Sequence, residues 1–189
     1  GKLIRRILVL KKAIFIAVSK TIVNEISNVK YESVIENPIN LTKRSSIDKN
    51  SNKVLKRLIF IGRLSKEKNP SLFLSLARKA NIDGVVFGEG YLRSELEEIS
   101  NLGANNVNFE GFVFNPWQKI QNGDLLVIPS DTEGDCLVLY ESVINEVPIL
   151  VSDIKVFRNL NLPDLYYCNN LEEYLNKIEQ ARFNLNKFN

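Results

Sequence analysis

Two cations stand where they could bind an anion. Arg63 and Lys68 lie in a short basic loop that follows the apolar run 58–61, and the Asn-Pro pair after Lys68 suits the cap and first position of a helix. Gly62, at the end of the run, lets the backbone approach a ligand closely. Two cations beside a helix N-terminus form an anion site. The alternative is a basic loop that is simply exposed to solvent.

Two carboxylates could bind hydroxyl groups nearby. Glu133 follows the apolar run 125–128, and Glu141 stands about one and a half turns into a helical pattern over 136–145. That helix is apolar on nearly every side, so Glu141 is expected to be partly buried, which is costly unless the carboxylate accepts hydrogen bonds. A pair of ribose hydroxyls would satisfy both of its oxygens. The alternatives are a solvent-facing stripe for Glu141 and a surface loop for Glu133.

Two further features are weaker candidates. Gly88-Glu89-Gly90 begins like a dinucleotide-binding fingerprint, but Arg93 occupies the position of the third glycine, so a plain strand-to-helix turn is the alternative. Cys136 stands at the start of the helix that carries Glu141. No base is available to activate its thiol, so we interpret it as a small apolar filler.

These residues require a sheet that brings the ends of several strands together. From residue 55 onward, short β-branched runs bounded by Gly and Pro alternate with helical patterns, which is typical of βαβ units. The predicted strands cover 58–61, 85–87, 107–109, 125–128 and 148–151, and the predicted helices cover 71–80, 91–100, 116–120, 136–145 and 171–183. The sequence therefore predicts an α/β fold, a doubly wound Rossmann-like parallel sheet, with its ligand at the carboxyl ends of the strands.

The first part of the chain is organised differently. Residues 1–40 contain only two predicted strands, 14–18 and 33–35, with helices over 2–12 and from Ser19. We interpret 1–40 as the tail of an N-terminal domain that the chain lacks, 41–56 as a polar linker, and 57–189 as the ligand-binding domain. The chain starts at Gly1 and contains no Met. We therefore expect it to be part of a longer protein.

The composition narrows the classes of function. The chain has no His, which excludes a Ser-His-Asp triad, a Cys-His pair and an HExxH zinc site. A net charge of +3, without a dense stretch of Lys and Arg among aromatic residues, does not indicate nucleic-acid binding. Two Cys outside CxxC spacing favour a reduced, cytoplasmic compartment. No apolar run is long enough to span a membrane, and the basic opening segment lacks the layout of a signal peptide.

In this order and spacing the motifs resemble the carboxyl-terminal domain of the GT-B fold glycosyltransferases of family 4, the glycosyl transferases group 1. The resemblance runs from about residue 14 to 153 and depends on five short motifs and on the stretches 16–20 and 35–38. The motifs are Gly62-Arg63 with Lys68, Gly88-Glu89-Gly90, Gly111 after a strand, Pro129-Ser130, and Glu133-Gly134 with Glu141.

The resemblance implies a role for each site residue. Arg63 and Lys68 would bind the donor diphosphate and stabilise the leaving nucleoside diphosphate, and Glu133 would face the transferred sugar, so these three carry the catalytic roles. Glu141 would hold the ribose. Gly62 and Gly88 would allow close approach to the donor. The helix start would offer its amides to the sugar or its phosphate, through Gly134, Asp135, Cys136 and Leu137.

The implied activity is hexose transfer with retention, from a UDP- or GDP-sugar to a saccharide or lipid-linked acceptor. No metal or other cofactor is expected. The expected pathway is surface polysaccharide assembly, such as O-antigen or capsule. The expected place is the cytoplasm, with peripheral contact at the inner membrane.

The sequence also departs from the family. Asp135 would repel a phosphate if it pointed inward, and the histidine that many relatives use near the sugar is absent. Because most of the acceptor domain is lacking, we expect the chain to bind donor without catalysing transfer. The alternatives are a non-catalytic nucleotide-sugar-binding module and a phosphorylase or epimerase of the same architecture.

Overall fold

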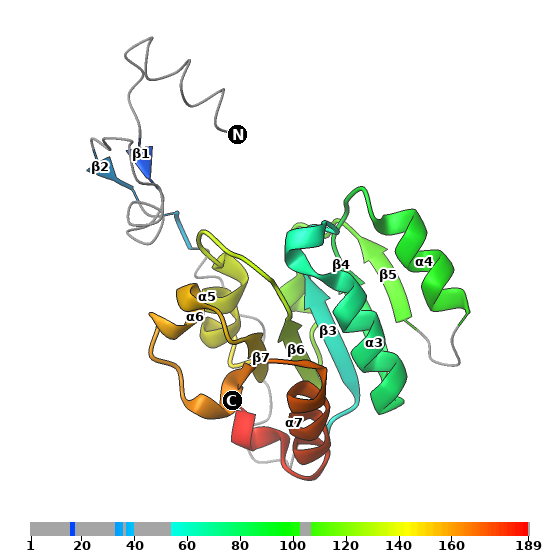
Figure 1. The fold of residues 1–189 in the computed structure, drawn as a ribbon. Helices are drawn as coiled ribbons and strands as arrows, with labels where there is room; N and C mark the ends of the chain where they lie inside the picture. The colour runs from blue at the N-terminus through cyan, green and yellow to red at the C-terminus, as the bar shows by residue number, and fades with distance from the viewer. Residues whose placement is uncertain (1–15, 18–32, 36, 40–53, 103–106, 189) are drawn as a thin grey trace.

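The fold is a six-stranded, wholly parallel sheet with helices on both faces (Figure 1). The computed structural model describes residues 16–17, 33–35, 37–39, 54–102 and 107–188. The strands occur in the spatial order β5-β4-β3-β6-β7-β8. Their bounds are β3 Arg57–Ile61, β4 Asp83–Phe87, β5 Val107–Gly111, β6 Asp124–Ile128, β7 Ile149–Ser152 and β8 Tyr167–Cys168. This order is that of a doubly wound Rossmann-like sheet, which confirms the predicted fold class.

Helices or short helical turns follow the strands. The α-helices are α3 Pro70–Ala80, α4 Arg93–Asn101, α5 Leu137–Ile144, α6 Lys155–Arg158 and α7 Leu171–Phe183. The 3-10 turns are η1 Lys66–Lys68, η2 Pro116–Lys119, η3 Asp164–Tyr166 and η4 Leu185–Phe188. The start of α3 follows the expected chemistry, because the side chain of Asn69 accepts a hydrogen bond from the Leu72 amide and Pro70 opens the helix.

Alternation along the strands produces two apolar cores. Leu58 and Phe60 of β3 pack with α3, α4 and α7 on one face of the sheet. Ile59, between them, packs with η2, α5 and α6 on the other face. Because the central strands are buried on both faces beyond their first residues, the rest of each strand is almost wholly apolar, as parallel sheets require.

The chain reverses its direction of growth between β3 and β6. Strands β4 and β5 extend the sheet from one side of β3, and β6, β7 and β8 extend it from the other. The loops after β3 and β6 therefore leave their strands toward opposite faces of the sheet and leave a crevice between them at the carboxyl edge.

The amino-terminal strands form a separate small pair. β1 (Ile16–Ala17) and β2 (Ser33–Val34) are parallel to each other. Asn37 lies just beyond them and donates a hydrogen bond from Nδ2 to Oδ2 of Asp135, at 3.1 Å. The helices predicted over 2–12 and from Ser19, and most of the segment 41–56, lie outside the described residues. The domain boundaries after residues 40 and 56 stay predictions.

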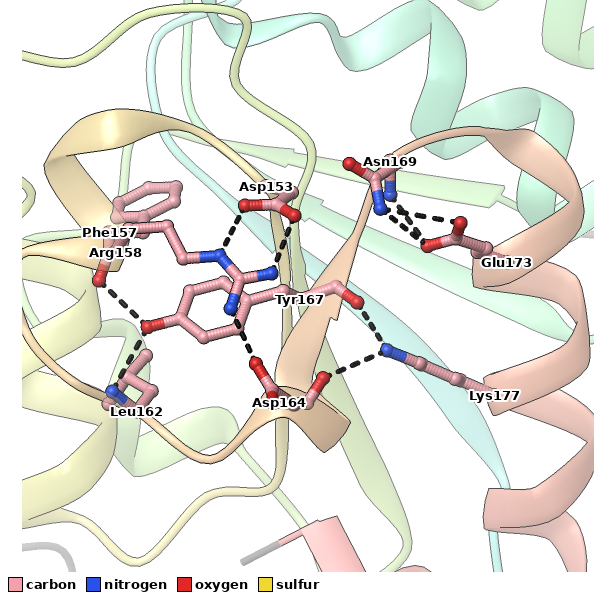
Figure 2. A network of polar contacts seen from close by, with 9 residues as sticks. All are labelled: Asp153, Phe157, Arg158, Leu162, Asp164, Tyr167, Asn169, Glu173 and Lys177. Atoms are coloured by element: carbon pink, nitrogen blue, oxygen red, sulfur yellow. Dashed lines mark hydrogen bonds and ion pairs between the residues drawn. The ribbon is translucent and has the colours of Figure 1, made fainter.

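One polar cluster fixes the connection from β7 to β8 (Figure 2). Arg158 of α6 donates from Nε and Nη2 to the two oxygens of Asp153, at 2.5 and 2.6 Å, and pairs through Nη1 with Asp164. Its guanidinium lies 3.9 Å from the ring centroid of Tyr167. The hydrogen bonds from Arg158 lower the pKa of Asp153. This cluster holds α6 and the strand ends in place, although α6 has only four residues.

Candidate functional site

A cavity of about 310 Å³ lies at the carboxyl ends of β3 and β6. The loop after β3 contributes Gly62, Arg63 and Lys68. The loop after β6 and the first turn of α5 form the facing wall, with Pro129, Ser130, Glu133, Asp135, Cys136, Leu137 and Val138. Most of the predicted site residues therefore surround one cavity, at the place where doubly wound sheets bind ligands.

A partly buried ion pair joins the two walls of this cavity. Nζ of Lys68 lies 2.6 Å from both carboxylate oxygens of Glu133, and the Ser130 hydroxyl donates to Oε1 of Glu133 at 2.7 Å. The side chain of Glu133 is 4% exposed and that of Lys68 is 27% exposed. Burying a carboxylate this deeply is costly unless hydrogen-bond and charge partners such as these compensate it. Lys68 and Glu133, expected to serve different parts of a ligand, thus neutralise each other directly.

The two loops that form the cavity are joined to each other. The Asp131 amide donates to the Glu67 carbonyl at 2.9 Å, and Nδ2 of Asn69 donates to Oδ1 of Asp131 at 3.0 Å. Ser65, at the start of the first loop, donates to Oε1 of Glu67 at 2.6 Å and lowers the pKa of that carboxyl. These bonds fix the spacing between the walls.

Gly88, a predicted donor-binding residue, is outside the residues that line the cavity. A Cβ on Gly88 would lie 1.8 Å from the Gly62 carbonyl oxygen, and a Cβ on Gly90 would lie 2.2 Å from the Leu64 carbonyl oxygen. The Gly62 amide also donates to the Phe87 carbonyl at 3.0 Å. In the structure, the two glycines of this turn admit the loop that carries Arg63 against β4.

Glu141 likewise lies outside the cavity lining, but it continues one of its walls. Leu137 and Val138 line the cavity, and Glu141 follows them by four and three residues on the same side of α5. Its Oε2 accepts a hydrogen bond at 3.0 Å from the indole Nε1 of Trp117, and Glu141 is partly buried. The two carboxylates therefore do not meet in a single crevice, and Glu141 stands next to it.

The start of α5 combines an acidic and a thiol side chain. Asp135 lines the cavity, and its Oδ2 accepts the hydrogen bond from Asn37. Cys136 is 5% exposed, and burial raises the pKa of its thiol to about 12, so the thiol is protonated at neutral pH. Gly134 lies between Glu133 and Asp135 but is outside the lining. Cys136 offers a protonated thiol rather than a nucleophile.

Metal binding and membrane insertion can be judged for the described ranges. Within them, no group of three or more His, Cys, Asp and Glu side chains is arranged to hold a metal ion. No helix in the same part of the chain is long and apolar enough to cross a bilayer. The expectation that no metal is required stays a prediction.

Sequence reasoning did not assign a role to Ser130 or Trp117. Ser130 stands in the Pro-Ser pair that contributed to the resemblance, so its position was visible although its bond to Glu133 was not. Trp117 is the only Trp of the chain and lies in a turn that was predicted as a helix over 116–120. No sequence signal connects it with Glu141, 24 residues away.

Comparisons with known proteins agree with the fold. The model of the family described as glycosyl transferases group 1 matches residues 42–181 of this chain. A relative in Campylobacter jejuni subsp. jejuni serotype O:2 is 34% identical over 126 residues, which are 63% of this chain and 34% of the relative. That relative is named GalNAc-alpha-(1->4)-GalNAc-alpha-(1->3)-diNAcBac-PP-undecaprenol alpha-1,4-N-acetyl-D-galactosaminyltransferase. The chain thus spans about a third of its length.

Solved structures share the architecture at lower identity. Anabaena HepE in complex with UDP and glucose superposes with a TM-score of 0.73 at 18% identity, over 93% of this chain and 55% of HepE. A TarM mutant of S. aureus in complex with fondaparinux, alpha-GlcNAc-glycerol and UDP gives 0.70 at 22% identity, over 89% of this chain and 36% of TarM. With the family match over 42–181, these similarities show that the chain belongs to the glycosyl transferases group 1 family and has the Rossmann-like fold of a GT-B glycosyltransferase domain.

Proposed function

We propose that this chain is the donor-binding part of a retaining glycosyltransferase that transfers a hexose from a nucleotide diphosphate sugar. The observation that carries the proposal is the meeting of Arg63, Lys68 and Glu133 around one cavity at the reversal point of the sheet. A diphosphate binds to cations and sugar hydroxyls donate to acceptors. This cavity offers both, with Arg63 and Lys68 as the cations and Glu133 as the acceptor.

The chemistry assigned to these residues is electrostatic. As the bond between the sugar and the diphosphate breaks, negative charge develops on the leaving phosphate, and Arg63 and Lys68 stabilise it. The diphosphate draws Lys68 away from Glu133. The carboxylate, still held by Ser130, then accepts hydrogen bonds from the sugar hydroxyls. Donor binding in this scheme exchanges one ion pair for two sets of contacts.

The relatives support a choice of donor and acceptor classes to test first. HepE and TarM both have structures with UDP, which makes UDP-sugars the first donors to test, before GDP-sugars. The Campylobacter relative is named for a substrate linked to undecaprenol through a diphosphate, which supports a lipid-linked acceptor. Such an acceptor would bring the protein to the membrane surface. Surface polysaccharide assembly stays the pathway that we propose. Because the match covers only 34% of that relative, we assign transfer itself to a longer protein that contains this domain.

Calorimetry of the chain with UDP and GDP tests donor binding. Arg63→Ala should weaken UDP binding about tenfold, the loss of one charged contact made by an exposed side chain, and should leave uridine binding unchanged. Arg78→Ala removes the same charge from the last turn of α3 and serves as the matched control. Equal weakening of UDP and uridine by Arg63→Ala would contradict the assignment of Arg63 to the diphosphate.

Turnover by the full-length parent tests the reaction. The proposal expects transfer from a UDP- or GDP-hexose to a lipid-linked acceptor, with NMR showing the anomeric configuration of the donor retained in the product. An inverted product would overturn the retaining mechanism. Binding of donor without transfer or hydrolysis would identify a non-catalytic module, and phosphorolysis or epimerisation of the sugar would identify a different enzyme.

A further inference from the structure

Trp117 is placed to control the orientation of Glu141. Trp117, in η2, is 4% exposed and belongs to the core cluster that also contains residues of α5 and α6. The single polar atom of its side chain, Nε1, donates to Oε2 of Glu141 at 3.0 Å. An indole N–H is a donor only, and a buried one requires an acceptor. Pro116 opens η2 and is itself buried, so the backbone that carries the indole is also held.

The bond leaves Glu141 partly available. A carboxylate has about four acceptor positions on two oxygens, and the indole occupies one of them. Oε1 makes no hydrogen bond with the residues that the structure describes. Asn145 holds the backbone of the same residue, since its backbone N–H and its Nδ2 both donate to the Glu141 carbonyl, at 3.0 and 2.8 Å. Backbone and side chain of Glu141 are thus both fixed before any ligand arrives.

We propose that Trp117 is a positioning residue for the nucleoside of the donor: it holds one oxygen of Glu141 and thereby presents the other to the ribose hydroxyls. The inference depends on the proposed function, because it takes the ligand of the cavity to be a nucleotide. Leu137 and Val138 link the two regions, since they line the cavity one turn before Glu141. A ribose attached to a diphosphate in the cavity would extend along α5 toward this carboxylate.

A purely structural role for the same bond makes a different prediction. If the carboxylate only satisfies the buried indole, removing the N–H destabilises the fold and weakens every ligand alike. If the indole orients Glu141, removing the N–H weakens only ligands that carry both ribose hydroxyls. The two roles are therefore distinguished by which ligands lose affinity, rather than by the stability of the protein.

The experiment measures the affinity of the chain for UDP, 2′-deoxy-UDP and pyrophosphate, with Trp117→Phe as the variant. The wild type should prefer UDP over 2′-deoxy-UDP, and Trp117→Phe should reduce this preference by a factor on the order of ten, the size of one charged hydrogen bond. Pyrophosphate binding should not change. Glu141→Gln should remove the preference in both backgrounds. Ile120→Val, which trims the same core and leaves the Trp117 N–H and Glu141 unchanged, should cost stability and keep the preference.

The outcomes separate this inference from the proposed function. A wild type that binds none of UDP, GDP and pyrophosphate refutes the proposed function itself. A wild type that binds UDP, with a preference that Trp117→Phe leaves unchanged or with equal weakening of pyrophosphate, overturns the role of Trp117 alone. If Trp117→Phe does not fold, the emission of the wild type decides, because Trp117 is the only Trp. Emission that changes with UDP and not with pyrophosphate supports the proposal, and emission that UDP leaves unchanged overturns it.

Discussion

Removing Lys68 should destabilise the protein more than removing the charge of its partner. In Lys68→Met the carboxylate of Glu133, 4% exposed, keeps only the Ser130 hydroxyl. Breaking a buried pair from one side costs about 3–5 kcal/mol, because the remaining charge is left without compensation. Water can enter the open cavity and Ser130 remains, so we expect a loss of roughly 2–3 kcal/mol. In Glu133→Gln the lysine, 27% exposed, can be hydrated, and we expect about 1 kcal/mol.

Urea denaturation followed by far-UV circular dichroism measures both changes. Lys66→Met is the matched control, since it removes the same charge from the same turn, where the side chain is exposed. The double variant Lys68→Met/Glu133→Gln should be more stable than Lys68→Met alone, because it leaves no buried charge. Glu133→Gln should also bind pyrophosphate more tightly than the wild type, since Lys68 no longer has a competing partner. A Lys68→Met variant as stable as Glu133→Gln would refute this account of the pair.

Three further predictions concern the frame around the cavity. Because Arg158 lowers the pKa of Asp153, the stability from this pair is complete above the ordinary Asp value of 3.8 and is lost as the pH falls through the lowered value. Urea midpoints measured across this range should therefore fall less steeply for Asp153→Asn than for the wild type. Gly88→Ala should lower the free energy of unfolding by about 1–3 kcal/mol, because its methyl group collides with backbone, and a fully stable variant in the same titration would contradict this. Cys136 and Cys168, both with thiol pKa values raised to about 12 by burial, should resist thiol-reactive dyes until urea unfolds the chain, and rapid native labelling would argue against their burial.

The sequence was informative wherever local chemistry decides the structure. The helix predicted over 171–183 has these bounds in the structure, because Asn170 caps it by accepting a hydrogen bond from the Glu173 amide at 3.0 Å. The central strands were recognisable because burial on both faces makes most of their residues apolar. By contrast, α6 has only four residues, and the contacts of Arg158 with Asp153 and Asp164 hold it. Such contacts leave no periodic pattern in the sequence.

The site was harder to predict from the sequence, because its contacts join residues that are far apart in the chain. The strand-end rule brought Arg63, Lys68 and Glu133 to one edge, and the structure brings them to one cavity. The direct pairing of Lys68 with Glu133 spans 65 residues and depends on how two loops fold against each other. The bond between Trp117 and Glu141 depends on the rotation of α5 about its axis, which an apolar helix does not reveal, because it lacks a clear polar face.

The hydrogen bonds between the two loops also affect how fast a ligand can bind. The loop after β3 is packed against the Gly88-Glu89-Gly90 turn and bonded to Asp131 of the opposite loop, so these strand ends form one connected frame. A preformed frame has little conformational entropy left to lose on association. Nucleotide capture should then follow a single exponential in stopped-flow traces, with a rate that rises linearly with ligand concentration and falls with added salt.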